Sequence, residues 1–187
     1  MTTRKTGFFS LELGLILLSA GLAMAQSSAG PPKPGPEHQK LAYFAGKWDI
    51  DADMKPSTFG PGGKAKYKQS CDWFEGNFAM VCHFDGTMQT GLLKGLSIMG
   101  WDPGAQTYTY FSTNSLGQGT FSRGTVEGDT WTWNNETKMN GKPVVIRFTL
   151  KQISADVATY KFEMGAPGGP LKLMMDGKQT RATLASN

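Results

Sequence analysis

Hydrophobic and polar residues alternate along most of the chain after Gly46, and this period of two is the pattern of β-strands with one buried face. Turn-forming residues interrupt the alternation about every dozen residues. No helical pattern separates the later runs, so the parallel crossovers of an α/β fold are excluded. One short helix is expected before the first strand, from Glu37 to Ala45, because Leu41 and Phe44 share a face and Gly46 follows. Four further strands, whose pairing partners the sequence does not fix, are expected near residues 47–54, 94–101, 107–113 and 119–126.

Other runs can be paired by centring hairpins on their turns. Asn140-Gly141 is the strongest turn signal, because both residues tolerate the positive φ angles of a type I′ turn. A hairpin centred there places Trp133 opposite Phe148, and it places Trp131 opposite Leu150 on the same apolar face. The other face of the hairpin is polar. The two strands should therefore have one face buried and one face in solvent.

The following strands continue the same apolar face. A three-residue loop, Ser154 to Asp156, pairs Phe148 with Phe162. The Gly-Pro-rich loop 165–170 then places Phe162 beside Leu173. A meander of this length exposes two sheet edges unless it closes on itself. The predicted fold is therefore all-β, an antiparallel up-and-down barrel of about ten strands with one short N-terminal helix, and such a barrel is wide enough inside for a small ligand.

The N-terminal segment has the three parts of a secretory signal peptide. Two basic residues precede an apolar run from Gly7 to Leu22, which is followed by the small-residue site Ala23-Met24-Ala25. A membrane anchor is the alternative, but the run is short for a span and contains Glu12. We therefore expect residues 1–25 to be removed, which leaves an exported chain, periplasmic or secreted, with no stable membrane insertion.

Residues 26–36 are rich in Pro, Gly and Ser and are expected to form an extended linker to a barrel domain that spans residues 37–183. Of the 187 residues, 24 are Gly and only 18% are charged. This composition is too apolar for a disordered protein and too rich in Gly for a helical bundle. The formal net charge of +4 is too small to favour binding to nucleic acid.

The two cysteines fall opposite each other in the predicted sheet. The turn from Glu75 to Phe78 pairs Cys71 with Cys82 and Trp73 with Met80. Directly opposed cysteines in an exported protein can form a cross-strand disulfide. The alternative is a pair of buried free thiols.

Few residues are suited to catalysis or to metal binding. The two histidines are His38, in the predicted helix, and His83, which alternation places on the outer face. No spacing of His, Cys and carboxylates is typical of a metal site, and the sequence contains no nucleophile elbow, phosphate-binding loop or dinucleotide fingerprint. No catalytic residue, metal or cofactor is therefore predicted.

The inner face of the predicted barrel is the remaining candidate site, because its aromatic and Met side chains would suit a small hydrophobic ligand oriented by a few polar groups. The candidate ligand-binding residues are Gln69, Trp73, Met80, Trp131, Trp133, Phe148, Tyr160 and Phe162. The sequence favours an exported, non-catalytic barrel that binds a small hydrophobic molecule. Two alternatives stay open: an enzyme that acts on a small molecule in the cavity, and a structural or interaction protein with a filled core.

Several segments resemble known proteins. Gly46-Lys47-Trp48 in the first strand, together with Arg181 in the last, is similar to the calycins (lipocalin-like proteins), in which the first-strand Trp closes one end of the barrel beneath a basic residue. From about Pro36 to Arg181 the chain resembles a bacterial family known as domain of unknown function 1579. The matching segments are His38-Gln39-Lys40-Leu41, Phe44-Ala45-Gly46-Lys47-Trp48, Gly100-Trp101-Asp102-Pro103 with Tyr108, Asn114-Ser115-Leu116-Gly117-Gln118-Gly119, Phe162-Glu163-Met164 and Gln179-Thr180-Arg181.

This resemblance implies a calycin-like barrel, often exported, with no established activity and no catalytic residues to carry over. It implies a structural, barrel-closing role for Gly46, Trp48 and Arg181.

Overall fold

The computed structural model describes residues 31–58, 60–88 and 91–183. The predicted signal peptide and residues 26–30 of the predicted linker lie outside the described residues. Within these described ranges, no helix is both long enough and apolar enough to cross a membrane.

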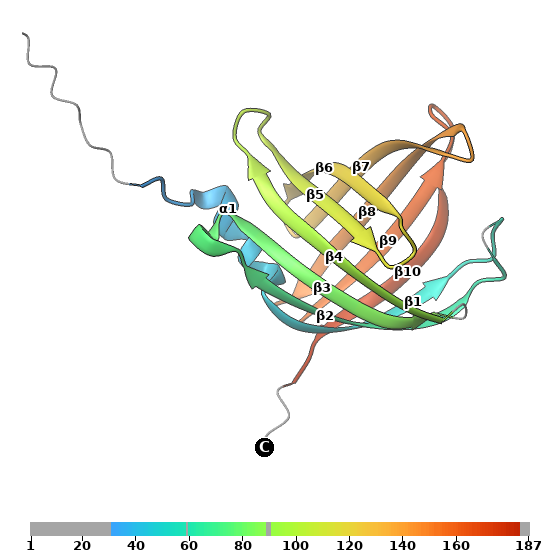
Figure 1. Cartoon of the computed structure of the whole chain (residues 1–187), viewed down its shortest axis with the longest axis horizontal. Coiled ribbons are helices and arrows are strands. Elements are labelled where there is room, and N and C mark those ends of the chain that lie inside the picture. Colours follow the sequence, from blue (N-terminus) through green and yellow to red (C-terminus); the bar gives the residue numbers. More distant parts are fainter. Residues whose placement is uncertain (1–30, 59, 89–90, 184–187) are drawn as a thin grey trace, which may run out of the picture. The chain divides into compact units, whose positions relative to one another are not determined.

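The described strands form a closed antiparallel barrel in which each strand pairs with its neighbours in sequence and the first strand also pairs with the last (Figure 1). The strands are β1 (Gly46–Met54), β2 (Gly63–Trp73), β3 (Ala79–Met88), β4 (Gly91–Asp102), β5 (Thr107–Asn114), β6 (Gly119–Glu127), β7 (Thr130–Met139), β8 (Lys142–Ser154), β9 (Val157–Gly165) and β10 (Lys172–Arg181). This architecture confirms the predicted up-and-down barrel. Because β1 pairs with β10, the sheet has no free edge.

The N-terminal helical segment is two short elements rather than the single helix expected from Glu37 to Ala45. Helix α1 covers Pro36–Lys40, and a 3₁₀ turn, η1, covers Leu41–Phe44. Leu41 and Phe44 are buried, as their shared face predicts. Helix α1 lies at one end of the barrel (Figure 1). The Tyr108 hydroxyl ties it to β5 by donating to the carboxylate of Glu37, with an oxygen-to-oxygen distance of 2.7 Å.

The hairpin registers predicted from the turns are largely confirmed. Trp133 lies opposite Phe148, and Trp131 lies opposite Leu150. On the outer face, the Nε atom of Arg147 lies 3.0 Å from a carboxylate oxygen of Glu163. Between β2 and β3, Cys71 pairs with Cys82 and Trp73 with Met80, although a 3₁₀ turn (η2, Glu75–Asn77) makes that connection longer than a tight hairpin.

The connection between β8 and β9 differs from the predicted three-residue loop. Ser154 pairs with Val157, so the turn has two central residues, and a bulge between Gln152 and Ser154 accommodates the extra residue. A one-residue bulge in β8 changes the pairing of the two strands by the same amount as the one extra residue of the predicted loop. Phe148 therefore still lies opposite Phe162, as predicted.

The predicted register between β9 and β10 is wrong. Leu173 lies opposite Glu163 rather than beside Phe162, and a register shift between Leu173 and Met175 places Met175 opposite Phe162. Leu173, Met174 and Met175 are consecutive apolar residues, so the alternation that fixes register elsewhere is lost here.

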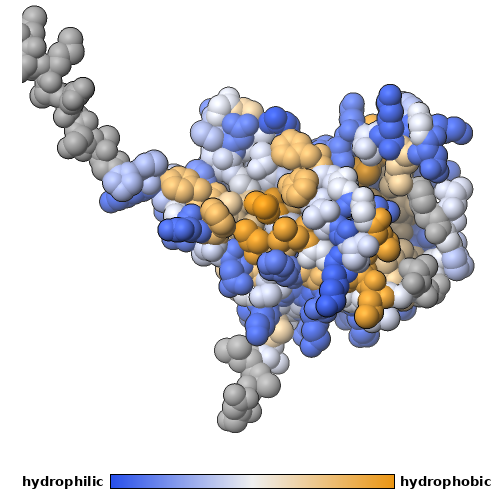
Figure 2. All heavy atoms as spheres, in the orientation of Figure 1, coloured by the Kyte–Doolittle hydropathy of each residue, from blue (hydrophilic) through white to orange (hydrophobic). Residues whose placement is uncertain are grey.

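The outer face of β3–β6 carries a row of apolar side chains. Val81, Ile98, Phe111 and Phe121 lie directly opposite one another on successive strands. Ile98, Phe111 and Phe121 are exposed. Figure 2 shows hydrophobic side chains gathered on the face over these strands. The row departs from the alternation of inward apolar and outward polar side chains that is typical of a barrel strand.

Candidate ligand-binding site in the barrel interior

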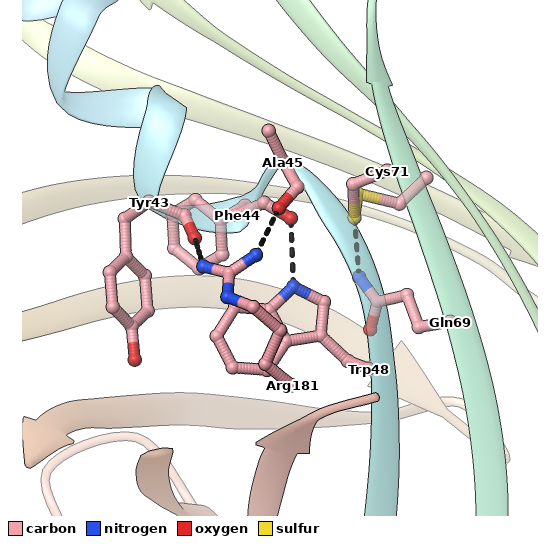
Figure 3. The surroundings of a disulfide bond; sticks show 8 residues. Tyr43, Phe44, Ala45, Trp48, Gln69, Cys71 and Arg181 are labelled. Carbon is pink, nitrogen blue, oxygen red and sulfur yellow. Dashed lines mark hydrogen bonds between the residues drawn. A yellow bond between two sulfur atoms is a disulfide. The ribbon is translucent and has the colours of Figure 1, made fainter. Parts of the chain in front are cut away.

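One end of the barrel is closed by Trp48 and Arg181 (Figure 3). The Arg181 guanidinium carbon lies 4.3 Å from the ring centre of Trp48, and its Nη1 donates a hydrogen bond to the Ala45 carbonyl. The Trp48 indole N–H donates to the Phe44 carbonyl over 2.9 Å. Gly46 has a φ of 98° and lies against the guanidinium, so a side chain there would be strained and crowded. These contacts hold η1 across the end of the barrel.

A disulfide joins β2 to β3 in the same half of the barrel, as the sequence predicts. Cys71 and Cys82 are bonded, with their Cα atoms 4.0 Å apart, and both are buried. The Gln69 side-chain amide donates to the Cys71 sulfur over 3.0 Å (Figure 3). The bond therefore faces the interior rather than solvent.

We expect the protein unfolded without reductant to take up no alkylating reagent, since both sulfurs are bonded. Replacing both cysteines by alanine should lower the free energy of unfolding by about 2–4 kcal/mol, because the crosslink no longer restricts the unfolded chain. Mass spectrometry after alkylation and urea unfolding measure the two effects. Two labels on the unreduced chain would show that the thiols are free.

The half of the interior next to η1 is filled by stacked aromatic side chains. The Trp131 and Trp133 rings are 5.5 Å apart and nearly parallel, at 12°. Phe44 packs edge-on against Trp131, with the ring centres 5.0 Å apart. Tyr108 also packs edge-on against the Trp131 indole, with the ring centres 4.7 Å apart. The predicted site residues Met80, Trp131, Trp133 and Tyr160 are all buried here, and Trp73 packs against them. We call this region the packed half.

In the other half of the interior, which we call the open half, the inward-facing apolar side chains are less completely buried. They lie toward the end where β1 joins β2 and β9 joins β10. The partly buried side chains include Tyr67, Phe84, Leu93, Ile146, Phe162, Met164 and Met175. Of the predicted site residues, Phe162 lies in this open half. Phe148 packs against the buried core, and Gln69 lies opposite Trp48 near the closed end. The structure therefore divides the predicted set between a packed core and an accessible wall.

Inward-facing glycines let several aromatic rings occupy the wall. Tyr67, Phe84, Trp133 and Tyr160 each lie directly opposite a glycine on the neighbouring strand, namely Gly86, Gly95, Gly124 and Gly177 respectively. In each pair the ring fills the space that a Cβ atom of the glycine would need. Because the rings cover the glycines, they take less of the space in the middle of the barrel.

Small polar side chains line the interior on β4–β6. Ser97 lies opposite Ser112, and Tyr110 lies opposite Ser122. These four residues are not among the candidate residues predicted from the sequence, although their strands were predicted. Registering the β4–β5 and β5–β6 hairpins would have placed them on the inner face.

The inward-facing groups between the two ends of the barrel are uncharged. Among the described residues, the inward positions that carry a charge are at the two ends of the barrel. Arg181 lies over Trp48 at the closed end, and Lys142 and Lys172 are exposed, each at the first residue of its strand. Burial raises the pKa of the Tyr160 phenol well above its ordinary value, and burial also raises the pKa of Tyr67. Both phenols therefore keep their protons at neutral pH. His83 is exposed on the outer face. This interior is suited to binding an uncharged molecule.

A groove of about 740 Å³ lies on the outer surface over β1, β10, β9 and β8. Aspartates, lysines and threonines line its walls. Lys64 contacts Asp53 at 2.9 Å, and Asp176 contacts Lys55 at 2.8 Å. These ion pairs partly neutralise the carboxylates of Asp53 and Asp176.

Two solved structures are similar to the barrel. Rv2717c from M. tuberculosis matches with a TM-score of 0.58 and 14% identity, covering 80% of this chain and 99% of that one. The S-type phycobiliprotein lyase CPES from Guillardia theta matches with a TM-score of 0.58 and 8% identity, covering 80% of this chain and 94% of that one. At these identities the likeness shows the fold alone. No curated protein sequence matches the chain.

A family model described as "Protein of unknown function (DUF1579)" matches residues 33–181. The match spans every described strand and includes Gly46, Trp48 and Arg181 at the closed end. The chain therefore belongs to the DUF1579 family.

Proposed function

We propose that this protein binds a small, largely apolar molecule in the open half of its barrel and performs no chemistry on it. The observation that carries the proposal is the contrast between the two halves of the interior. Trp131 is 1% exposed in the packed half, whereas the inward-facing Phe162 and Ile146 remain partly exposed. When a ligand covers apolar side chains that are accessible to solvent inside a barrel, their surface is removed from water, and this burial favours binding.

The shape of the wall supports a flat ligand. Tyr67 and Phe84 cover glycines on the neighbouring strands, so ring surfaces line the open half. Aromatic faces bind other flat ring systems by offset stacking as well as by burial of apolar area. Met164 on β9 and Met175 on β10 are flexible and can adapt to ligands of different outline.

The proposal includes export of the protein. The sequence pattern of residues 1–25 and the cross-strand disulfide both support it, because disulfides persist in oxidising compartments. A mature chain recovered from outside the cytoplasm should begin at Gln26, which N-terminal sequencing measures.

The test is a fluorescence titration with prodan, a neutral naphthalene that carries a ketone and brightens in apolar surroundings. We expect one molecule to bind per chain. Replacing Ile146 with tryptophan puts a larger side chain into the open half and should weaken binding at least about tenfold, since a ligand and the added ring compete for the same space.

Val145→Trp is the matched control, because Val145 is the neighbouring residue on β8 and faces outward, opposite Glu136. The control should bind prodan as the unaltered protein does. Urea unfolding of both variants verifies that each is folded. Equal affinity in the two variants, or no binding by the unaltered protein, would contradict the proposal.

A further inference from the structure

The inner wall of β4–β6 carries polar groups that have no partner in the described part of the chain. Ser97 is 2% exposed and Ser122 is 8% exposed, and neither side chain makes a hydrogen bond with another described residue. Tyr110 and Ser112 are half-buried beside them, and their hydroxyls are likewise unpaired within the described ranges. Buried polar groups are almost always hydrogen-bonded, to the protein or to ordered water, and a ligand can take the place of that water.

These four side chains form one patch, which we call the polar wall. Ser97 and Ser112 are directly opposite each other on β4 and β5, and Tyr110 and Ser122 are directly opposite on β5 and β6. Tyr110 and Ser112 are two residues apart on one strand, so the two pairs are adjacent on the inner face. The four hydroxyl-bearing residues therefore lie together on the inner face of the barrel.

A ligand can reach the hydroxyls of the polar wall more easily than the unpartnered polar groups of the packed half. The indole N–H groups of Trp131 and Trp133 are also unpartnered, but they are sealed from solvent by the surrounding rings. The serine hydroxyls keep some accessible surface. Each hydroxyl can donate one hydrogen bond and accept others, so the patch can satisfy a carbonyl, hydroxyl or amide group.

The charge of the lumen restricts the ligand further. The polar wall is neutral, and the inward-facing lysines, Lys142 and Lys172, are exposed at the rim. A carboxylate or phosphate placed at the polar wall would lose its hydration without gaining a counter-charge, which is costly. A neutral polar group loses much less hydration free energy when it is placed there.

We infer that the ligand is an uncharged amphiphile, with a neutral carbonyl, hydroxyl or amide group held by Ser97, Tyr110, Ser112 and Ser122 and an apolar body against the wall that contains Phe162. This inference rests on the proposed function, because it assigns the ligand class of the same site. It adds the orientation of the ligand and the absence of charge on its buried end.

The test compares prodan with its naphthoate analogue, in which a carboxylate replaces the propionyl ketone. We expect the naphthoate to bind at least about tenfold more weakly. Ser97→Ala, Ser122→Ala and Tyr110→Phe should each weaken prodan binding by about two- to tenfold, which is the effect of one lost hydrogen bond. They should leave the binding of the naphthoate unchanged.

Ser70→Ala is the matched control, since Ser70 is on the outer face of β2, opposite His83. This control should change neither the affinity for prodan nor the affinity for the naphthoate. Prodan binding that Ile146→Trp blocks but that no hydroxyl variant weakens would overturn the polar wall and leave the proposed function standing. Equal or tighter binding of the naphthoate, lost on Lys172→Gln, would show instead that an anionic group is held at the rim.

Discussion

Replacing Trp48 with alanine is expected to lower the free energy of unfolding by about 3–5 kcal/mol, the cost of emptying a fully buried aromatic site. Trp48 is 1% exposed, and its ring supports the Arg181 guanidinium above it. Its N–H also donates to the Phe44 carbonyl, so η1 loses a direct tie to the barrel. Urea unfolding followed by circular dichroism measures the change.

A graded series keeps this prediction testable if the alanine variant does not fold. Trp48→Phe retains most of the ring but loses the hydrogen bond to the Phe44 carbonyl, so it should be intermediate in stability. Phe74→Ala is the control, because Phe74 is 62% exposed and its loss should change stability by less than about 0.5 kcal/mol. Similar midpoints for Trp48→Ala and Phe74→Ala would show that Trp48 does not close the barrel.

Replacing Gly177 with alanine should lower the free energy of unfolding by about 2–4 kcal/mol, although it adds only one methyl group. The new Cβ would overlap the Asp51 carbonyl oxygen, which belongs to the backbone of β1 and cannot turn away. It would also displace the Tyr160 hydroxyl, which donates to that same carbonyl over 3.2 Å. Both the pairing of β10 with β1 and the hydrogen bond are therefore disturbed.

Gly119→Ala is the matched control for this substitution. Gly119 is also a strand glycine, in β6, but its Cβ would come no closer than 3.7 Å to any other atom, a normal contact with the Ser112 carbonyl. Stability should stay the same or rise slightly, because alanine restricts the unfolded chain more than glycine does. Equal losses for the two variants would show that the loss at Gly177 does not come from the close approach of Tyr160 and Asp51.

The sequence predicts most of the strand pairing because polar and apolar residues alternate cleanly around the turns. The Asn140-Gly141 turn and the alternation on either side fix Trp133 opposite Phe148, as observed. The prediction fails between β9 and β10, where Leu173, Met174 and Met175 remove the alternation and allow a bulge. It also gives no sign of the exposed Phe111 and Phe121, which occupy outward positions that are usually polar.

The candidate site could be predicted only in part, because alternation shows which face a side chain is on but not how far along the barrel the core extends. That depth is set by η1, whose Phe44 packs on Trp131 and fills one half of the interior. Alternation places Trp131 and Phe162 alike on the inner face. In the structure, however, Trp131 is buried in the packed half and Phe162 is partly exposed in the open half. The polar wall was missed for another reason, since Ser97 and Ser122 have side chains that are common on either face of a strand.

Methionine-methyl NMR tests directly whether the open half of the barrel holds the ligand. The interior has methionines in both halves: Met80 and Met99 are buried in the packed half, whereas Met164 and Met175 face the open half. Single Met→Leu variants assign the signals. When prodan is added, we expect the methyl signals of Met164 and Met175 to shift until binding is saturated and those of Met80 and Met99 to move far less. Saturable binding with no shift at Met164 or Met175 would place the ligand elsewhere on the protein and rule out the open half as its site.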